Sequence, residues 1–488
     1  MIAEEPLLFE IGSDDKTAVD FPPQPDAEEC LGSCRRTKKI GLPGLSEPEA
    51  MRHYTRLSQM NISVDSAFYP LGSCTMKYNP RLNEKMAALS GFSEIHPFQP
   101  QNTVQGALEA IYILNELLAE LTGMKAVAFS PAAGAHGELC GMMTIRAALT
   151  HRGDAREVVL VPESAHGTNP ATAAMCGYRI ETIPVNAEGL VDIAALQKRL
   201  VHGEKNVAAF MLTNPNTCGL FERDILKMAD MVHEAGAFFY MDGANFNAIM
   251  GHVKPADLGV DAMHINVHKT FSTPHGGGGP GAGPVVFNAE LAPFMPLPWV
   301  EKDGDTYRLI EANDGSVHSF GRMRAFNGQF AVLIRALAYI LAMGLPGLRQ
   351  AAEDAVLNAN YVRVKLQDIL HLPYPGTCMH EVLFDDSSLE GTGVTTLDIA
   401  KNLIDAGFHP MTIYFPLIVH GAMLIEPTET ESKRTLDEFV AAVRSIVAKA
   451  KEGKAEELTA APVNAFRRRL DETTAARNPV LVYKDETQ

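Results

Sequence analysis

One lysine stands in a stretch whose composition is typical of phosphate binding or covalent attachment. The stretch reads NVHKTFSTPHGGGGPGAGP from Asn266 to Pro284, and Lys269 comes just before its glycine-rich run. Such a lysine could clamp a nucleotide phosphate, belong to a dinucleotide-binding fingerprint, or anchor a cofactor through its amine. The order of the residues separates these three interpretations.

The two nucleotide-binding interpretations fit the stretch poorly. A P-loop needs its glycines before the lysine, so that backbone N–H groups wrap the phosphate where a helix begins, but Lys269 precedes them. Gly276, Gly278 and Gly281 formally match GxGxxG, yet a dinucleotide fingerprint follows a strand and opens a helix. This stretch is broken by Pro280 and leads into GPVVF, which has the composition of a strand.

The third interpretation is a Schiff-base lysine. A lysine at the end of a buried strand is desolvated, which favours the free amine as a nucleophile. Pyridoxal phosphate (PLP) needs such a lysine and a carboxylate that keeps its pyridine nitrogen protonated. Asp242 ends the apolar run AFFYMDG and can supply that carboxylate. Asn245, three residues later, could reach the phenolic oxygen of the ring.

The phosphate of PLP needs N–H donors, which a helix start provides. Gly134 and Ala135, in the segment AAGAHGE, stand where a helix is expected to begin. His136 could add a side-chain donor, and His268, adjacent to Lys269, could also contact the phosphate.

The flat ring needs a stacking partner, and His166 follows the apolar run VVLVP in a suitable place. Thr168 in ESAHGTNP and Asn216 in TNPNTCG are further candidate cofactor-binding residues at strand ends. Each residue alone has an ordinary explanation, because a buried Asp often caps a turn and a lone His is more often structural. Their joint occurrence in this order favours PLP, with Lys269, Asp242 and His166 as the catalytic residues.

These residues need a framework that brings strand ends together. Short apolar segments predict strands, namely KAVAFS, VVLVP, RIETIPV, VAAFMLTN, AFFYMDG, AMHINV and GPVVF. Helical spacing is found at 106–121, in ELCGMMTIRAALT, and near 171–176, 192–201 and 224–235. The alternation predicts an open α/β sheet, in which ligands bind at the carboxyl ends of the strands.

Three parts are predicted along the chain. Residues 1–95 form an arm and a helical segment, in which Ser46 and Glu49 make a capping box for a helix over 47–60. Residues 96–345 form the large α/β domain, and residues 346–488 a smaller C-terminal α/β domain that a helical stretch over 325–370 joins to it.

The segment PTETES leaves two interpretations open. Thr428 and Glu431 have the spacing of a capping box for the last long helix. The segment also lies in a loop near a possible cleft, which allows a functional role.

Composition limits the class of protein. The chain has 488 residues and a formal net charge of −17, which argues against nucleic acid or an anionic membrane as the main partner. Its 7 cysteines include no paired CxxC set, so no metal site is predicted, and Cys30 and Cys34 are expected to be free thiols. The N-terminus has no secretory-signal pattern. The apolar stretch FAVLIRALAYILAMGL carries an arginine and is too short to predict a membrane span. A soluble, cytoplasmic protein is expected.

Five segments resemble a known family. ESAHGTNPATAA, YMDGANFNA, NVHKTFSTPHGGGGPG, PLGSCTMKYNP and IEPTETES closely resemble the glycine dehydrogenase (decarboxylating) P-protein of the glycine cleavage system, over about residues 46 to 440. The family occurs as one very long chain or as two shorter subunits. The length and the lysine motif of this chain resemble subunit 2, the half that carries PLP.

The resemblance implies a PLP-dependent fold type I enzyme of the aspartate aminotransferase class, with Lys269 as the covalent anchor. It implies decarboxylation of glycine, release of CO2, and transfer of the aminomethyl group to the lipoyl arm of the H-protein. The implied partner is P-protein subunit 1, in a heterotetramer of two plus two subunits. The alternative is a PLP-dependent decarboxylase or lyase that acts on another amino acid. Asn245 departs from the His or Gln that many fold type I enzymes have there.

Some roles stay open at this point. Ser73, Cys74, Thr75 and Lys77 of the GSCTMK loop could line the entrance for the lipoyl arm. For the glycine carboxylate, Arg322 and Arg324 are candidates on charge alone, and both could equally be surface arginines.

Overall fold

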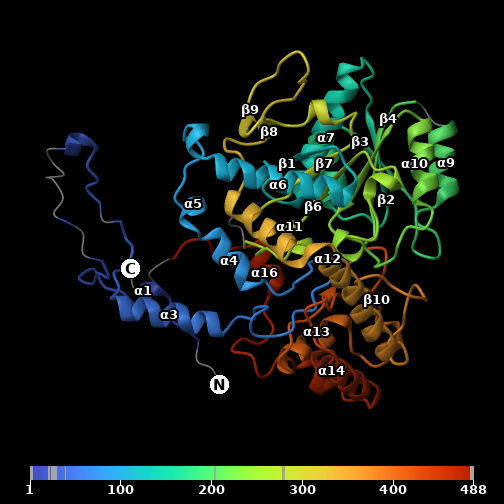
Figure 1. The fold of residues 1–488 in the computed structure, drawn as a ribbon. Coiled ribbons are helices and arrows are strands. Elements are labelled where there is room, and N and C mark those ends of the chain that lie inside the picture. The colour runs from blue at the N-terminus through green and yellow to red at the C-terminus, as the bar shows by residue number, and fades with distance from the viewer. Residues whose placement is uncertain are drawn as a thin grey trace. The chain divides into compact units, whose positions relative to one another are not determined.

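The computed structural model describes residues 4–19, 22, 30–38, 40–202, 205–276 and 281–483. Two compact units are present, Met1–Ala67 with Ala460–Gln488, and Phe68–Thr459. The first unit contains short helices and one longer helix, α1 (Leu8–Ile11), α3 (Glu47–Gln59) and α16 (Glu472–Arg477) (Figure 1). The predicted capping box is confirmed on α3, where Ser46 N–H donates to the Glu49 carboxylate at 2.9 Å. The three-part division of the chain stays a prediction.

A seven-stranded sheet forms the centre of Phe68–Thr459, in the order β1-β7-β6-β5-β4-β2-β3. Its strands are β1 (Ala126–Ala128), β2 (Val158–Pro162), β3 (Arg179–Ile183), β4 (Val207–Thr213), β5 (Phe238–Gly243), β6 (Ala262–Ile265) and β7 (Val285–Phe287). All neighbours are parallel except those of β7, which runs antiparallel to both β1 and β6. Every predicted strand is confirmed, and so is the mostly parallel sheet.

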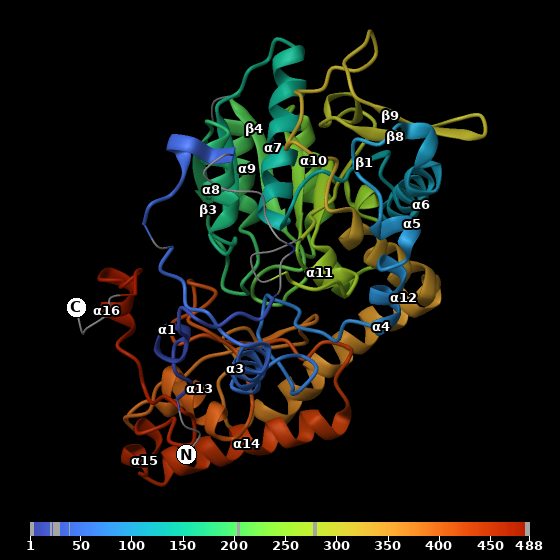
Figure 2. The ribbon, with the colours of Figure 1, turned by 90° about the vertical axis from the view of Figure 1, so that its left-hand side faces the viewer.

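Helices cover both faces of this sheet because its central strands are apolar on both sides. In β5, Phe239 and Met241 join one hydrophobic cluster, and Phe238 and Tyr240 join another on the opposite face. The first face is covered by α6 (Gln105–Thr122), α9 (Ile193–His202), α10 (Ile225–Glu234) and the first half of α12 (Phe330–Leu366). The second face is covered by α7 (Gly134–His151) and α8 (Thr168–Met175), and Figure 2 shows α7 running along the strands.

The longest helix, α12, is apolar enough to cross a membrane by length and composition. It is kinked at Gly344, where φ is 60° and ψ 174°, and Pro346 follows inside the helix. Val332, Leu333 and other residues of its first half are buried in the core of the large sheet. The helix is therefore a core helix of the folded chain, and it spans the region predicted to be helical.

The C-terminal part of Phe68–Thr459 has a hydrophobic core of its own, formed around the second half of α12. Its elements are β10 (Val382–Phe384), α13 (Thr396–Asp405), β11 (Thr412–Ile413), β12 (Met423–Ile425), α14 (Lys433–Lys451) and α15 (Ala455–Thr459). The strands form a three-stranded antiparallel sheet in the order β10-β12-β11. The other described α-helices and strands of the unit are α4 (Arg81–Ala87), α5 (Ser90–Ser93), α11 (Val267–Thr270) and the hairpin of β8 (Trp299–Asp303) and β9 (Thr306–Ile310).

The predicted capping box in PTETES is wrong. Helix α14 begins at Lys433, and its N-cap is Ser432, whose hydroxyl accepts a hydrogen bond from Thr435 N–H. Thr428 is instead buried with a positive φ of 63°. Because Thr428 and Glu431 lie before the cap residue, the PTETES segment is a loop whose role has to be sought in its other contacts.

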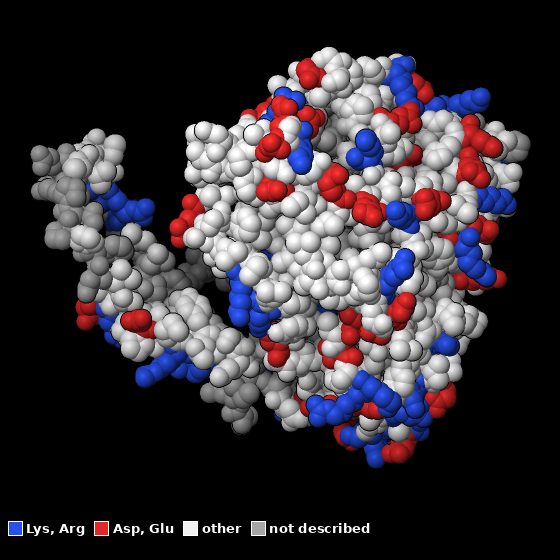
Figure 3. Space-filling model, in the orientation of Figure 1, with Lys and Arg blue, Asp and Glu red and all other residues white. Residues whose placement is uncertain are grey.

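Surface charge is mixed in sign. On the face of Phe68–Thr459 seen in Figure 3, acidic and basic side chains are intermingled. The net charge of −17 is therefore not gathered into one acidic patch on that face.

Candidate functional site

Asp242 is the penultimate residue of β5 and is buried at the carboxyl edge of the sheet. Its Oδ2 accepts a hydrogen bond from Asn169 Nδ2 at 2.9 Å, and its Oδ1 accepts one from Ala244 N–H at 2.9 Å. His264 Nε2 lies 3.3 Å from Oδ1. Burial alone would raise the pKa of this carboxyl, but His264, the two hydrogen bonds and the charge of Lys269 together bring it below its ordinary value. Asp242 is therefore ionised at neutral pH.

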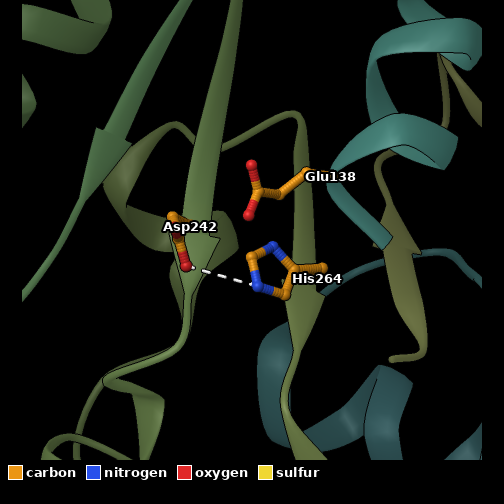
Figure 4. Close-up of side chains that lie close together, drawn as sticks. All are labelled: Glu138, Asp242 and His264. Atoms are coloured by element: carbon orange, nitrogen blue, oxygen red, sulfur yellow. Dashed lines mark ion pairs between the residues drawn. The ribbon is translucent and has the colours of Figure 1, made fainter. Parts of the chain in front are cut away.

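Glu138 and His264 lie beside Asp242 (Figure 4). His264 is on β6, the parallel neighbour of β5, and Tyr240 OH lies 2.7 Å from its Nδ1. Burial, followed by the charge of Asp242, raises the pKa of Glu138 to about 7. Our sequence reasoning missed Glu138, His264 and Asn169, although the motifs AAGAHGE, AMHINV and ESAHGTNP contain them.

Helix α7 can reach this cluster because it carries glycines where it crosses the sheet. A Cβ atom at Gly137 would lie 2.8 Å from His264 Cβ, and one at Gly141 would lie 2.3 Å from the ring of Tyr240. The helix therefore approaches β5 and β6 closely enough to place Glu138 next to Asp242.

Lys269 lies on α11, directly after β6, with only 8% of its surface exposed. Among the residues that the structure describes, none hydrogen-bonds to or pairs with its amine. Its neighbour His268 packs edge-on against His275, with ring centroids 4.7 Å apart. Burial, with the charges of His275 and Lys269, lowers the pKa of His268 to about 3, so this side chain is neutral.

The N-terminus of α7 begins at Gly134, as the sequence predicts. Its backbone approaches the end of the glycine-rich run, because a Cβ atom at Gly283 would lie 2.1 Å from Ala133 O. Residues 277–280, which include Gly278 and Pro280, lie outside the described part of the chain. The described end of the run therefore fits closely against the segment that precedes α7.

Ala135 and His136 belong to the first turn of α7. His136 Nδ1 accepts a hydrogen bond from Ala132 N–H at 3.1 Å, and burial followed by the charge of Arg324 lowers its pKa. Arg324 Nη1 is buried, and no residue in the described part of the chain makes a hydrogen bond to it. In contrast, Arg322 Nη2 pairs with Glu311 at 2.8 Å. Of the two candidate arginines, Arg324 thus has a donor available near the start of α7.

His166 is held in the loop between β2 and α8. Its Nδ1 lies 2.9 Å from Thr168 Oγ1, and its ring meets that of Phe415 at a centroid distance of 5.6 Å. Thr168 Oγ1 in turn lies 2.7 Å from Glu138 Oε1. Burial lowers the pKa of His166, which favours the neutral ring.

The two asparagines predicted to bind a cofactor are buried, but they differ in their contacts. Asn245 donates from Nδ2 to Pro215 O at 2.9 Å, and its Oδ1 has no partner. The side chain of Asn216 makes four hydrogen bonds, to Gly189 O, Glu222 Oε1, Cys218 N–H and Leu220 N–H. A cofactor contact by Asn216 would have to replace one of these four bonds.

The GSCTMK and PTETES loops meet close to Lys269. Lys77 Nζ, which is fully buried, pairs with Glu429 Oε1 at 2.7 Å and donates to Thr270 O at 3.3 Å. Burial raises the pKa of the Cys74 thiol to about 11, and Lys269 only partly opposes this shift. Cys74 is therefore a protonated thiol at neutral pH. Through the Lys77–Glu429 ion pair, the PTETES loop packs with the GSCTMK loop close to Lys269.

Several buried polar atoms at this edge of the sheet have no hydrogen-bond partner among the residues that the structure describes. They are Asn169 Oδ1, Thr213 Oγ1, Asn214 Nδ2, Asn245 Oδ1, Asn266 Oδ1 and Thr270 Oγ1. Such orphaned atoms are costly unless a bound group satisfies them. With an ionised carboxylate, an unpartnered lysine amine and a helix N-terminus, the residues present fit the pyridine nitrogen, aldehyde and phosphate of PLP.

Two family descriptions match the chain. Residues 137–308 match "Aminotransferase class-V", and residues 351–466 match "Glycine dehydrogenase, C-terminal domain". The first match includes Asp242 and Lys269.

Among solved structures, the chain resembles a glycine decarboxylase (P-protein) of the glycine cleavage system in inhibitor-bound form. The TM-score is 0.72 at 21% identity, over 88% of this chain and 100% of that one. It also resembles the cysteine desulfurase of Thermococcus onnurineus, with a TM-score of 0.60 at 15% identity, over 78% of this chain and 95% of that one. At these identities the likeness shows the fold, which is the PLP-dependent fold type I.

Curated relatives give the family. The chain is 60% identical to a probable glycine dehydrogenase (decarboxylating) subunit 2 of Caulobacter vibrioides, over 99% of this chain and 93% of the relative. It is 52% identical to a protein of the same description from Caldanaerobacter subterraneus, over 97% of this chain and 98% of the relative. The chain therefore belongs to the family of glycine dehydrogenase (decarboxylating) subunit 2, the P-protein of the glycine cleavage system.

Proposed function

We propose that this chain is the PLP-bearing subunit of a glycine decarboxylase and that PLP is bound covalently to Lys269. One observation carries the proposal: Lys269, a buried lysine whose amine has no partner among the described residues, shares the carboxyl edge of the sheet with a buried, ionised carboxylate, Asp242. When bound, PLP supplies an electron sink for the electron pair released as CO2 leaves glycine.

Asp242 is proposed to face the pyridine nitrogen and keep it protonated. Asn169, Ala244 N–H and His264 fix the carboxylate in place and hold it ionised. Glu138, behind it, is part of the same buried network. A fixed charge in a water-poor site stabilises charge that develops during the reaction more effectively than water does.

The start of α7 is proposed to bind the phosphate through the N–H groups of Gly134 and Ala135, with His136 and His268 beside it. These donors belong to an 18-residue helix, so its dipole also favours an anion there. Arg324, whose Nη1 lacks a partner, is the proposed ligand for a second anion, the carboxylate of glycine.

His166 is proposed to stack on the ring, positioned by its contact with Thr168. Asn245 is proposed to contact the phenolic oxygen, for which its Nδ2 must leave Pro215 O. The GSCTMK loop forms a wall beside Lys269 and helps to exclude water, which favours loss of the strongly solvated carboxylate of glycine.

The chain is also proposed to work with partners. "Subunit 2" in the names of its relatives points to a subunit 1, and we expect an assembly of two plus two subunits. We further propose that the lipoyl arm of an H-protein receives the aminomethyl group, and that the chain acts in the cytoplasm.

Exchange of labelled bicarbonate into glycine tests this function. The purified chain, combined with a subunit 1 and lipoyl H-protein, is expected to catalyse the exchange and to show the absorbance of a PLP–lysine linkage that borohydride abolishes. Lys269→Ala should lose both properties, whereas Lys227→Ala, at an exposed position on α10, should keep both. A complete mixture that exchanges no label but decarboxylates another amino acid would contradict the choice of substrate. A colourless protein that PLP does not change would contradict the cofactor.

A further inference from the structure

Two buried glutamates lie opposite each other at the end of a strand pair, in the part of the chain that follows α12. Strands β10 and β12 are antiparallel, with Val382 opposite Ile425. Glu381 precedes Val382 and Glu426 follows Ile425, so the next pair in this register places the two carboxyl groups face to face. Both side chains are fully buried, and so is that of the adjacent His380.

Each glutamate holds the backbone of the GSCTMK loop. Glu381 Oε2 accepts a hydrogen bond from Ser73 N–H at 2.7 Å, and Glu426 Oε2 accepts one from Thr75 N–H at 2.9 Å. Thr75 Oγ1 also donates to Glu426 Oε1. Ser73 and Thr75 have φ values of 65° and 49°, a region that non-glycine residues rarely adopt without support from their surroundings. The carboxyl pair therefore fixes a strained loop next to Lys269.

The two carboxyl groups are too close to carry two charges. One ligand atom from each of Glu381, Glu426 and His380 lies within 4.8 Å of the others. Like charges at this separation in a buried site cannot both ionise. In line with this, burial and the charge of Glu426 raise the pKa of Glu381, and burial raises the pKa of Glu426 despite its hydrogen bonds to Thr75.

The surrounding charges favour retention of one negative charge. Lys269 acts on both glutamates, whereas the second cation in the cluster, Lys77, is already paired with Glu429. Burial lowers the pKa of His380 to about 3, so its ring is neutral. Within the described ranges, the other titratable groups that interact with the pair are His275 and the thiols of Cys74, Cys218 and Cys378. Lys269 is therefore the cation that the pair can balance.

We propose that Glu381 and Glu426 share one proton and together hold a single negative charge beside the Lys269 amine. The pair is a positioning and charge-balancing site: its hydrogen bonds fix the GSCTMK loop, and its single negative charge lies close to the Lys269 nitrogen. The effect on a PLP-bound lysine rests on the proposed function, whereas proton sharing does not.

Infrared spectroscopy of Glu381→Gln, Glu426→Gln and the double variant tests the shared proton. Glutamine keeps a carbonyl acceptor for the loop N–H group, so the change is mainly one of charge. With one shared proton, each single variant leaves an ionised glutamate. Each is therefore expected to lose the C=O band of one protonated carboxyl at neutral pH, and the double variant to lose no more.

The other possible states give different infrared results. No lost band in either single variant would mean two ionised groups, and twice the loss in the double variant would mean two protonated groups; either result overturns the proposal. A divalent cation retained by the purified protein and lost in both variants would also overturn it. Asp261→Asn is the matched control. Asp261 is a buried carboxyl that directly precedes β6 of the seven-stranded sheet and accepts a hydrogen bond from Phe239 N–H at 2.6 Å. It should leave this band unchanged.

Thermal unfolding shows whether each variant is folded. If the double variant does not fold, the infrared spectra of the two single variants still test the shared proton.

A second readout uses the PLP–lysine absorbance. Its titration midpoint should shift by less than about 0.3 pH unit in each single variant and fall by about 1 unit in the double variant. Equal, additive shifts in the single variants would contradict the shared proton. A protein that binds no PLP would contradict the proposed function alone, because the infrared result does not depend on the cofactor.

Discussion

Asp242 keeps its charge in a buried position because donors converge on it from three elements. Asn169 on α8, the Ala244 N–H after β5 and His264 on β6 all favour the ionised form. Glu138, only one helix turn from the start of α7, has the opposite tendency, with its pKa raised to about 7 by burial and by Asp242. The neighbouring carboxyls are thus held in different states by their surroundings, a pattern typical of acid–base sites.

Asp242→Asn should show what this charge contributes. The change keeps the shape of the side chain but removes the anion, so we expect PLP to bind about tenfold more weakly and glycine exchange to fall about 100-fold or more. Because its pKa lies below the ordinary value near 3.8, Asp242 stays ionised above that pH, and its contribution should be constant between about pH 5 and 8. PLP titrations and exchange rates across that range check this. An Asn variant with wild-type affinity and rate would contradict the assigned role.

At the scale of elements, the site depends on how closely α7 lies on the sheet. Gly137 and Gly141 face His264 and Tyr240, where a Cβ atom would meet atoms closer than 3.0 Å. This approach brings the N-terminus of α7 and Glu138 to the carboxyl ends of β5 and β6. Gly106, in the first turn of α6, has open space around the position of its Cβ. Helical glycines of these two kinds should respond differently to substitution.

Gly141→Ala should destabilise the chain by about 1–3 kcal/mol, because the added methyl group overpacks against the ring of Tyr240. Gly106→Ala should be neutral or stabilise the chain by up to about 1 kcal/mol, since alanine favours the helix and nothing obstructs its methyl group. Denaturant unfolding of both variants measures the difference. Equal effects of the two substitutions would show that α7 does not lie as close to β5 as the structure has it.

For the whole molecule, the hydrophobic cores define what folds as a unit. All four hydrophobic clusters of buried residues found in the described chain consist of residues between Phe68 and Leu458. Helix α4, in the predicted N-terminal segment 1–95, belongs to this set. Its Ala87 is in the large core, and its Glu84 pairs with Arg335 of α12 at 2.8 Å. The GSCTMK loop lies within the same unit.

A chain of residues 68–459 should therefore fold cooperatively, with a melting temperature within about 5 °C of that of the full chain. A chain of residues 96–459 loses α4 and the GSCTMK loop, and it should melt at a clearly lower temperature or remain unfolded. Calorimetry of the three chains makes the comparison. If the chain from residue 96 is as stable as the longer one, the large domain begins there, as the sequence predicts.

The sequence by itself determined the sheet and the edge of the sheet at which the candidate site residues lie. Most strands from KAVAFS to GPVVF are short apolar runs bounded by turn residues. Because parallel strands end at one edge of a sheet, Asp242 and the Lys269 motif could be brought together from the sequence alone. Ser46 could also be predicted as a helix cap, since capping is decided within four residues. These features are local, or they follow from the strand pattern alone.

Only the tertiary structure decided which distant side chains complete the site. Thr428 and Glu431 have the spacing of a capping box, but Ser432 caps α14, and the PTETES loop turns towards Lys77 through Glu429. The pairing of Glu381 and Glu426 with a loop more than 300 residues earlier in the chain depends on how β10 and β12 align beside that loop. The protonation of such buried groups depends on the distances between them, and spacing in the sequence does not contain those distances.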